Sequence, residues 1–121
     1  MDKNDELDFF VMACLAGSPQ GTYGYALVRA LERHFGLIVP LPSVYRVLDR
    51  LITQEYIAWR QGELAERYAG MPRKICWLTD AGRREALKLA VIRRDKALRL
   101  QTASDWIERH LGGQEGASGR I

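Results

Sequence analysis

The sequence lacks long apolar runs, and this absence argues against a membrane-spanning helix. Its longest apolar run is the eight residues from Phe9 to Ala16, whereas a transmembrane helix needs about 20 predominantly apolar residues. A secretory signal is not expected either, because the first eight residues hold four acidic side chains and one lysine, and such a signal begins with basic residues. We therefore expect a cytoplasmic protein without a membrane partner.

Cysteine and histidine are also scarce, which bears on disulfides, metals and catalysis. Cys14 and Cys76 each lie in an apolar stretch, so we expect buried free thiols in a reducing compartment, with a disulfide as the alternative. Neither cysteine has ligand spacing to His34 or His110, so no metal site is predicted. Because the sequence also has no glycine-rich phosphate loop and no nucleophile motif, we expect neither an enzyme nor a cofactor.

What is present is the composition of one folded, soluble domain. The chain has 121 residues, of which 47% are hydrophobic and 27% are charged, and a chain of this size can form a core without disulfides or metal. Its formal net charge is +3. Residues 1–40 hold three basic and five acidic side chains, residues 41–79 six and four, and residues 80–121 nine and six. This balance is compatible with a nucleic-acid partner without requiring one.

Apolar residues at helical spacing predict three helices in the first half of the chain. We expect them at about residues 5–16, 23–35 and 42–54. Thr22 is a candidate N-cap of the second helix, and Gly36 follows its last turn. Pro42 suits the first turn of the third helix, where its missing N–H would be unpaired in any case.

The second half of the chain predicts a β-hairpin and a long helix. Residues 57–60 and 74–78 are candidate strands, and the polar segment between them indicates a hairpin with a long tip. Thr79 is the expected N-cap of the last helix, which has no glycine or proline from Arg83 to Leu111. This helix is either one rod or is broken near residues 95–100, because its apolar face changes direction there.

Three helices followed by a hairpin and a long helix predict a mainly α fold, the winged helix-turn-helix with a three-helix core, a two-stranded wing and a long C-terminal helix. Four segments then carry a likeness to a known family, and they are Thr22-Tyr-Gly-Tyr25, Pro42 to Leu51, Tyr56-Ile57 and Arg73 to Gly82. Together they resemble the PadR-like family of transcriptional regulators over about residues 7–90. The sequence departs from the family pattern at Glu55, where a glycine is usual, so this residue must adopt a left-handed turn or avoid it.

The third helix is the predicted DNA-recognition element. Its apolar positions Val44, Val47, Leu48 and Leu51 share one face, which we expect to pack inward. The opposite face is either an ordinary solvated surface or enters the major groove, where side chains near the helix start contact base edges, and the winged-helix context favours the groove. The candidate DNA-contacting residues on this helix are Ser43, Tyr45, Arg46, Asp49 and Arg50. The wing adds Arg67, Arg73 and Lys74, and the resemblance implies a phosphate contact for Tyr25.

The last helix is the expected dimer contact. The resemblance implies dimerisation through it, and its apolar residues Leu87, Val91 and Leu98 require a partner to cover them, with Trp106 in the same role further along. The expected domains are a DNA-binding domain over residues 1–79, a dimerisation helix or helices over 80–111 and a disordered tail over 112–121. A homodimer with two-fold symmetry would hold two recognition helices about 34 Å apart, which suits a pseudo-palindromic site.

Taken together, these features predict a dimeric, sequence-specific regulator of double-stranded DNA that represses by occupying its operator. One alternative is an architectural or partition-site DNA-binding protein of a plasmid or phage. Another is a winged-helix protein-interaction module that does not bind DNA. Some family members bind a small-molecule effector at the dimer interface, but the last helix has no aromatic residue before Trp106, so the sequence does not support an aromatic effector pocket.

Overall fold

A computed structural model describes the backbone of residues 3–63, 67–68 and 71–113, and the side chains of residues 6–63 and 73–113. The chain divides into two compact units, with the first ending at Leu87 and the second starting at Lys88. The domain limits expected from the sequence stay predictions, and most of the predicted tail lies outside the described residues.

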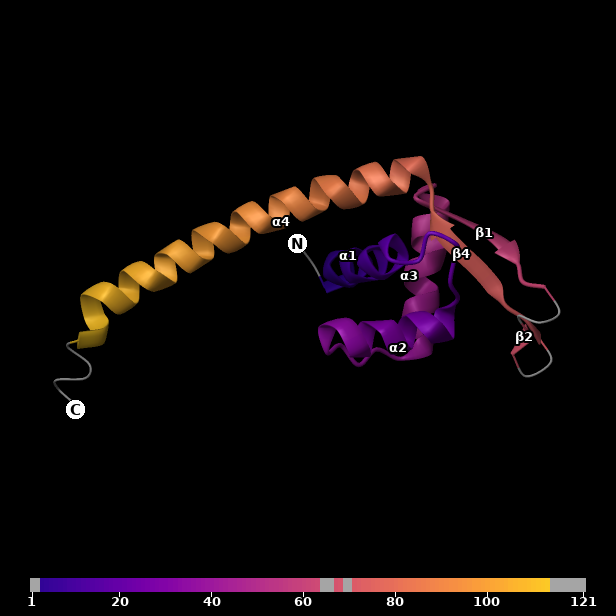
Figure 1. Cartoon of the computed structure of the whole chain (residues 1–121), viewed down its shortest axis with the longest axis horizontal. Coiled ribbons are helices and arrows are strands. Elements are labelled where there is room, and N and C mark those ends of the chain that lie inside the picture. The colour runs from indigo at the N-terminus through magenta and orange to yellow at the C-terminus, as the bar shows by residue number, and fades with distance from the viewer. Residues whose placement is uncertain (1–2, 64–66, 69–70, 114–121) are drawn as a thin grey trace. The chain divides into compact units, whose positions relative to one another are not determined.

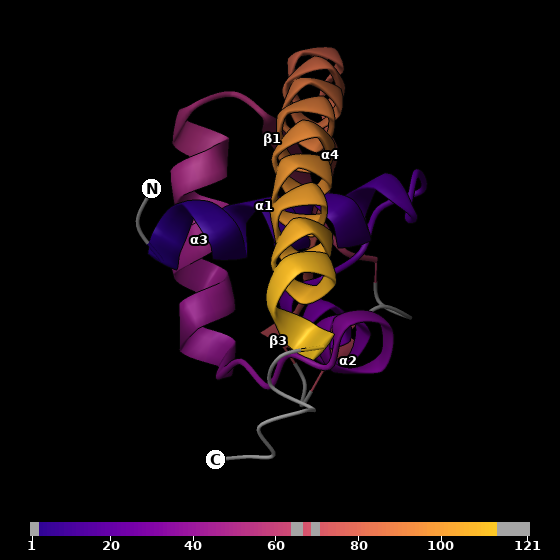
Figure 2. The same ribbon diagram turned by 90° about the vertical axis from the view of Figure 1, so that its left-hand side faces the viewer.

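The first unit is built on three helices at the predicted positions. They are α1 (Lys3–Ala16), α2 (Gly24–Phe35) and α3 (Leu41–Thr53). Each helix contacts the other two, and α3 runs across α1 and α2 when the views of Figure 1 and Figure 2 are compared. The helix ends follow the expected chemistry, because Gly36 adopts a left-handed conformation after α2 and Pro42 lies in the first turn of α3.

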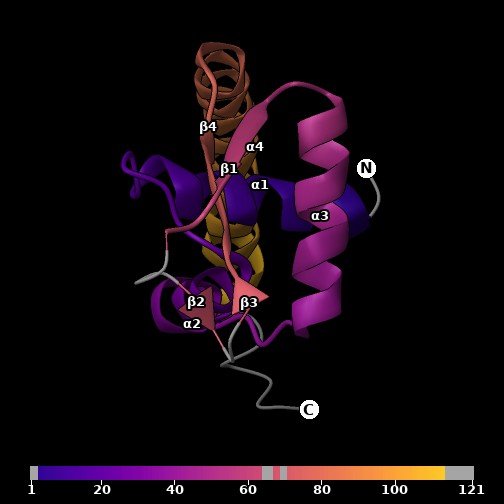
Figure 3. The same cartoon turned by 90° about the vertical axis from the view of Figure 1, so that its right-hand side faces the viewer.

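The predicted hairpin is present and carries a second, smaller strand pair. Strands β1 (Ile57–Gln61) and β4 (Lys74–Leu78) pair antiparallel, with Ile57 opposite Leu78. Within the long tip, β2 (Arg67–Tyr68) pairs with β3 (Met71–Pro72), which the sequence analysis did not predict. Figure 3 shows the hairpin beside α3, and β1 contacts that helix.

The role predicted for Thr22 as a helix cap is wrong. The N-cap of α2 is Tyr23, and Thr22 instead pairs with Cys76 in an isolated antiparallel bridge. Their backbones exchange two hydrogen bonds, from the Thr22 N–H to the Cys76 carbonyl at 2.9 Å and from the Cys76 N–H to the Thr22 carbonyl at 2.7 Å. The segment before α2 therefore extends the wing by one bridge and ties it to the helical core.

The core of the first unit lies between the three helices and the hairpin. Its apolar side chains are at most 8% exposed, and they are Val11, Met12, Cys14, Leu15, Leu27, Leu31, Val44, Val47, Leu48, Leu51, Ile57, Ile75, Cys76 and Leu78. All four residues of the predicted inward face of α3 are among them, which confirms that prediction. Both cysteines are buried free thiols, as expected. Burial of one such apolar side chain stabilises a fold by about 1.5–3 kcal/mol.

The turn after α3 contains a residue in the left-handed conformation that is not glycine. Glu55 has φ 66°, which makes it the only such non-glycine residue in the described part of the chain. Two hydrogen bonds close the turn, from the Glu55 N–H to the Ile52 carbonyl and from the Tyr56 N–H to the Leu51 carbonyl, each 2.9 Å long. This is the bonding pattern of a Schellman motif, in which glycine is preferred at the Glu55 position.

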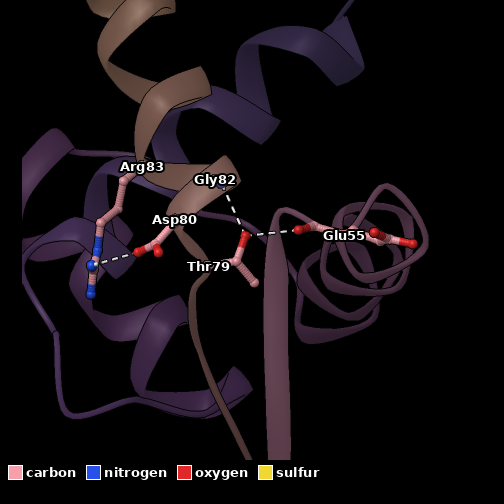
Figure 4. A network of polar contacts seen from close by, with 5 residues as sticks. All are labelled: Glu55, Thr79, Asp80, Gly82 and Arg83. Atoms are coloured by element: carbon pink, nitrogen blue, oxygen red, sulfur yellow. Dashed lines mark hydrogen bonds and ion pairs between the residues drawn. The ribbon is translucent and has the colours of Figure 1, made fainter.

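A threonine links this turn to the start of the next helix, α4 (Asp80–Ile107). The Thr79 hydroxyl donates to the Glu55 carbonyl at 2.7 Å and accepts the Gly82 N–H at 3.0 Å (Figure 4), so its predicted capping role is confirmed. Gly82 lies against the backbone carbonyl of Tyr56, so a Cβ at this position would collide with that oxygen. Close packing therefore explains the glycine of the Leu-Thr-x-x-Gly segment.

Most of α4 belongs to the second unit. The helix is continuous to Ile107 and ends in the π-helical turn η2 (Glu108–Gly112), so it has no break near residues 95–100. On the last turns, the imidazole of His110 stacks on the indole of Trp106 with ring centroids 4.2 Å apart. Charged side chains interrupt the apolar ones throughout, and none of the helices in the described chain is both long and apolar enough to cross a membrane.

Candidate nucleic-acid interface

The outward face of α3 carries an exposed arginine that a serine orients. The Arg46 Nη2 group donates to the Ser43 Oγ atom at 3.0 Å, one helical turn earlier. A guanidinium has five N–H donors, so this bond leaves Arg46 able to donate to a base edge or a phosphate. The pair brings two of the predicted DNA-contacting residues together near the start of the helix.

Tyr45 occupies the junction between α3 and the start of α2. A Cβ added to Gly24 would lie 2.7 Å from the Cε1 atom of the Tyr45 ring, so the ring rests directly on the glycine backbone. This contact explains why glycine stands between the two tyrosines of the Thr22-Tyr-Gly-Tyr25 segment. Tyr25 and Tyr45 both remain partly accessible, with 42% and 46% of their surface exposed.

A lysine on the wing connects the hairpin to α3. The Lys74 Nζ atom lies 4.0 Å from the Asp49 Oδ1 atom on α3 and 4.6 Å from the centre of the Trp59 ring on β1. Ammonium groups are attracted to the face of an indole ring, so Trp59 and Asp49 both favour this position. Lys74 thereby compensates the acidic residue that would otherwise repel a DNA backbone from α3.

The other predicted wing cations differ in what the structure describes. The Arg73 guanidinium lies 3.9 Å from the centre of the Tyr23 ring, so the residue before β4 contacts the N-cap of α2. The backbone of Arg67 belongs to β2, but its side chain lies outside the described residues. The contact of Trp59 with Lys74 could not be predicted from the sequence, because a single aromatic residue in a strand does not indicate which cation it will contact.

Arg50 points away from the exposed face and contacts α1. Its Nη2 atom is 2.6 Å from the Asp8 Oδ1 atom, and its Nε atom is 3.2 Å from Oδ2. The contact is therefore bidentate, which is the strong geometry for an arginine–carboxylate pair. The Asp8 side chain is 14% exposed and that of Arg50 is 36% exposed. Sequence reasoning could not find Asp8, because 42 residues separate it from its partner.

The buried thiols serve packing and not chemistry at this surface. Burial raises the pKa of Cys76 to about 11, and Lys74 acts in the opposite direction. Burial also raises the pKa of Cys14, while Arg33 lowers it. Both thiols therefore stay protonated and unreactive near neutral pH. Among the side chains that the structure describes, no group of three or more histidine, cysteine or acidic residues could hold a metal ion.

A three-helix core whose third helix presents a polar face beside a β-hairpin is a winged helix-turn-helix domain. The chain belongs to the transcriptional regulator PadR-like family, whose sequence model matches residues 11–88. This result confirms the resemblance drawn from the sequence. The family consists of transcriptional regulators and not of enzymes.

Solved structures share this fold. A PadR family transcriptional regulator from Eggerthella lenta DSM 2243 is 26% identical, with a TM-score of 0.67 over 81% of this chain and 85% of that one. A PadR family regulator from Clostridium difficile R20291 is 21% identical, with a TM-score of 0.63 over 79% and 96%. Bacillus subtilis PadR, solved in complex with operator DNA, is 18% identical, with a TM-score of 0.63.

The match to Bacillus subtilis PadR covers 74% of this chain and 48% of that protein, so this chain aligns with about half of its length. A comparison with curated proteins gave no significant match.

Proposed function

We propose that this protein is a homodimeric, sequence-specific DNA-binding repressor that acts by occupying an operator. The observation that carries the proposal is the exposed face of α3, where Arg46 is oriented by Ser43 and the neighbouring acid Asp49 is compensated by Lys74. An oriented arginine on a groove-sized helix is suited to guanine O6 and N7. The operator complex of Bacillus subtilis PadR, a protein of the same fold, supports this assignment.

Eight of the nine predicted DNA-contacting residues have a place in this proposal, and the exception is Arg50, which contacts Asp8 on α1. Ser43, Tyr45, Arg46 and Asp49 face the groove from α3. Tyr25, Arg73, Lys74 and Arg67 flank it from the start of α2 and from the wing, where they contact phosphates or the minor groove. In this proposal, the residues of α3 contact base edges and select the DNA sequence. The residues of α2 and the wing fix the position of the protein on the duplex.

The dimer half of the proposal rests on exposed apolar residues of α4. Leu87, Val91 and Leu98 are 69%, 53% and 67% exposed, and at 100° per residue they share one face of the helix. Trp106 is 58% exposed and extends the apolar surface toward η2. A second copy of the chain is the occupant that two-fold operator recognition requires. Occupancy of the operator by that dimer is sufficient to exclude polymerase.

Fluorescence anisotropy with two duplexes tests the DNA half. The probes are the DNA upstream of the protein's own gene and a scrambled duplex of equal length, at about 50 and 200 mM salt, a range in which phosphate-driven binding weakens steeply. Tighter binding to the upstream DNA that survives the higher salt supports the proposal. Equal binding that is lost at high salt favours the architectural alternative, and no binding favours the protein-interaction module.

Arg46→Ala is the decisive variant in this assay. We expect it to weaken binding to the preferred duplex by about 1–3 kcal/mol and to relax discrimination at one base pair. Arg33→Ala is the matched control, because it removes the same charge from the last turn of α2. Equal losses for the two variants would contradict a specific role for Arg46.

Light scattering tests the dimer half. The double substitution Leu87→Glu and Val91→Glu places two charges on the proposed contact face, and we expect a monomer with an intact first unit by circular dichroism. Lys96→Glu is the control for added negative charge, because Lys96 lies on the opposite face of the same helix and its replacement changes the net charge by the same −2. A double variant that remains dimeric would assign the contact to a different face of α4.

A further inference from the structure

Arg50 is a predicted DNA-contacting residue whose guanidinium is engaged within the protein. Two hydrogen bonds and an ion pair join the Arg50 guanidinium to the Asp8 carboxylate. The Asp8 side chain is the more deeply buried of the two. Asp8 is anchored on α1, one of the two helices that support α3. The restraint on Arg50 is thus set by a residue of α1 and not by the exposed face of α3.

The position of Arg50 on α3 makes this restraint relevant to binding. Arg50 follows Arg46 by four residues, so the two side chains lie one turn apart along the helix. A long arginine side chain released from α1 at this position could reach a phosphate beside the groove. Each phosphate contact adds affinity for any duplex, irrespective of its sequence. A phosphate contact by Arg50 would therefore strengthen non-specific binding and lower the ratio of specific to non-specific affinity.

We propose that Asp8 is a specificity-determining residue, which holds Arg50 against α1 and so withholds a phosphate-binding cation from the recognition helix. This inference rests on the proposed function as a DNA-binding protein. Asp8 acts through Arg50 and is a positioning residue, since it lies on α1 and does not itself contact DNA. The predicted DNA contact of Arg50 becomes conditional on the loss of this restraint.

The test compares the salt dependence of binding to the scrambled duplex for the wild type and Asp8→Asn. The asparagine keeps the shape of the side chain and removes the charge that holds the guanidinium. We expect the plot of log affinity against log salt to steepen by about 0.9 per bound subunit, the value for one added phosphate contact. Between about 200 and 50 mM salt, binding of the variant should therefore tighten about 3.5-fold more per subunit than that of the wild type.

Two control proteins separate release of Arg50 from a simple change in net charge. In the double variant Asp8→Asn with Arg50→Gln, the slope should return to the wild-type value, because the released cation is gone. Glu6→Gln removes an exposed acid from the same helix and should not steepen the slope. A steeper slope that persists in the double variant, or that Glu6→Gln reproduces, would overturn the proposal in favour of long-range electrostatics.

A measurement on the wild-type chain covers the case in which Asp8→Asn does not fold. The Nε–H resonance of Arg50, assigned by its absence in Arg50→Lys, should stay unshifted in NMR spectra when the scrambled duplex is added, while that of Arg46 shifts. A shift of the Arg50 signal equal to that of Arg46 would show that Arg50 already contacts phosphate, and the proposal would be wrong. A wild type that binds neither duplex would overturn the proposed function, whereas binding with an unchanged slope in a folded Asp8→Asn would overturn only the role of Asp8.

Discussion

Replacement of Glu55 by glycine should stabilise the protein. Glu55 adopts φ 66° in the turn after α3, a conformation that costs an L-residue with a Cβ about 1–2 kcal/mol. Glycine avoids this cost but loses about 0.5–1 kcal/mol through the greater freedom of the unfolded chain. The net expectation for Glu55→Gly is a gain of about 0.75 kcal/mol in the free energy of unfolding, within a range of about 0–1.5 kcal/mol.

The hydrogen bonds of this turn make the substitution a clean test of backbone strain. Glu55 contributes only backbone groups to the turn bonds that join α3 to α4, through its N–H to Ile52 and its carbonyl to Thr79. Both groups remain in glycine, and the Glu55 side chain is exposed. The effect should therefore come from the dihedral angle and not from a lost contact.

Urea denaturation at a fixed protein concentration measures the difference. Gln54→Gly is the matched control, because the preceding residue has φ −79° and gains nothing from glycine, so a loss of about 0.5–1 kcal/mol is expected there. The two neighbouring substitutions should thus change stability in opposite directions. If both destabilise the protein equally, the argument from the left-handed conformation is refuted.

Two further predictions concern close packing and pH. Gly82→Ala should destabilise the protein by about 1–2 kcal/mol in the same assay, because overpacking against the Tyr56 carbonyl exceeds the helix propensity of about 1 kcal/mol that alanine adds, whereas Gly112→Ala, with nothing within 4 Å of the added Cβ, should not. The second rests on the pKa of Cys76, which folding raises from 9.0 to about 11. Its stabilising effect is complete below pH 9 and lost as the pH rises toward 11, so unfolding curves recorded over this range should show a decline in stability that is smaller by about 2–3 kcal/mol in Cys76→Ala than in the wild type.

Local chemistry made most of the first unit predictable from the sequence. Periodic apolar residues placed the three helices, and the inward face of α3 followed directly from the spacing of Val44, Val47, Leu48 and Leu51. Thr79 and Gly36 marked helix ends because capping depends on neighbours within a few residues. The family resemblance marked Glu55 as a position where glycine is usual, but it left open whether the turn there is left-handed, and the structure shows that it is.

The contacts that organise the candidate interface were not predictable in this way. Thr22 pairs with Cys76, and Arg73 packs on Tyr23, across separations of about 50 residues that periodicity does not encode. Thr22 was assigned to a helix cap because threonine is a frequent cap, and a β-bridge with a distant strand overrode that local preference. The small β2–β3 pair in the wing was missed for a related reason, since two-residue strands carry no alternation.

The charge of α3 shows why these distant contacts matter for function. The sequence places Arg46, Asp49 and Arg50 on this helix, which suggests two cations that compete equally for DNA. In the structure, Asp8 engages Arg50 and Lys74 lies near Asp49, while the side-chain bond of Arg46 is to the neutral hydroxyl of Ser43. The net charge of α3 alone is +1, and it remains +1 when Asp8 and Lys74 are added. In the folded chain, each acid lies beside a cation of another element, and the remaining positive charge is that of Arg46. Under the proposed function, residues outside α3 thus select which of its charges is available to DNA, and this selection is a property of the tertiary structure.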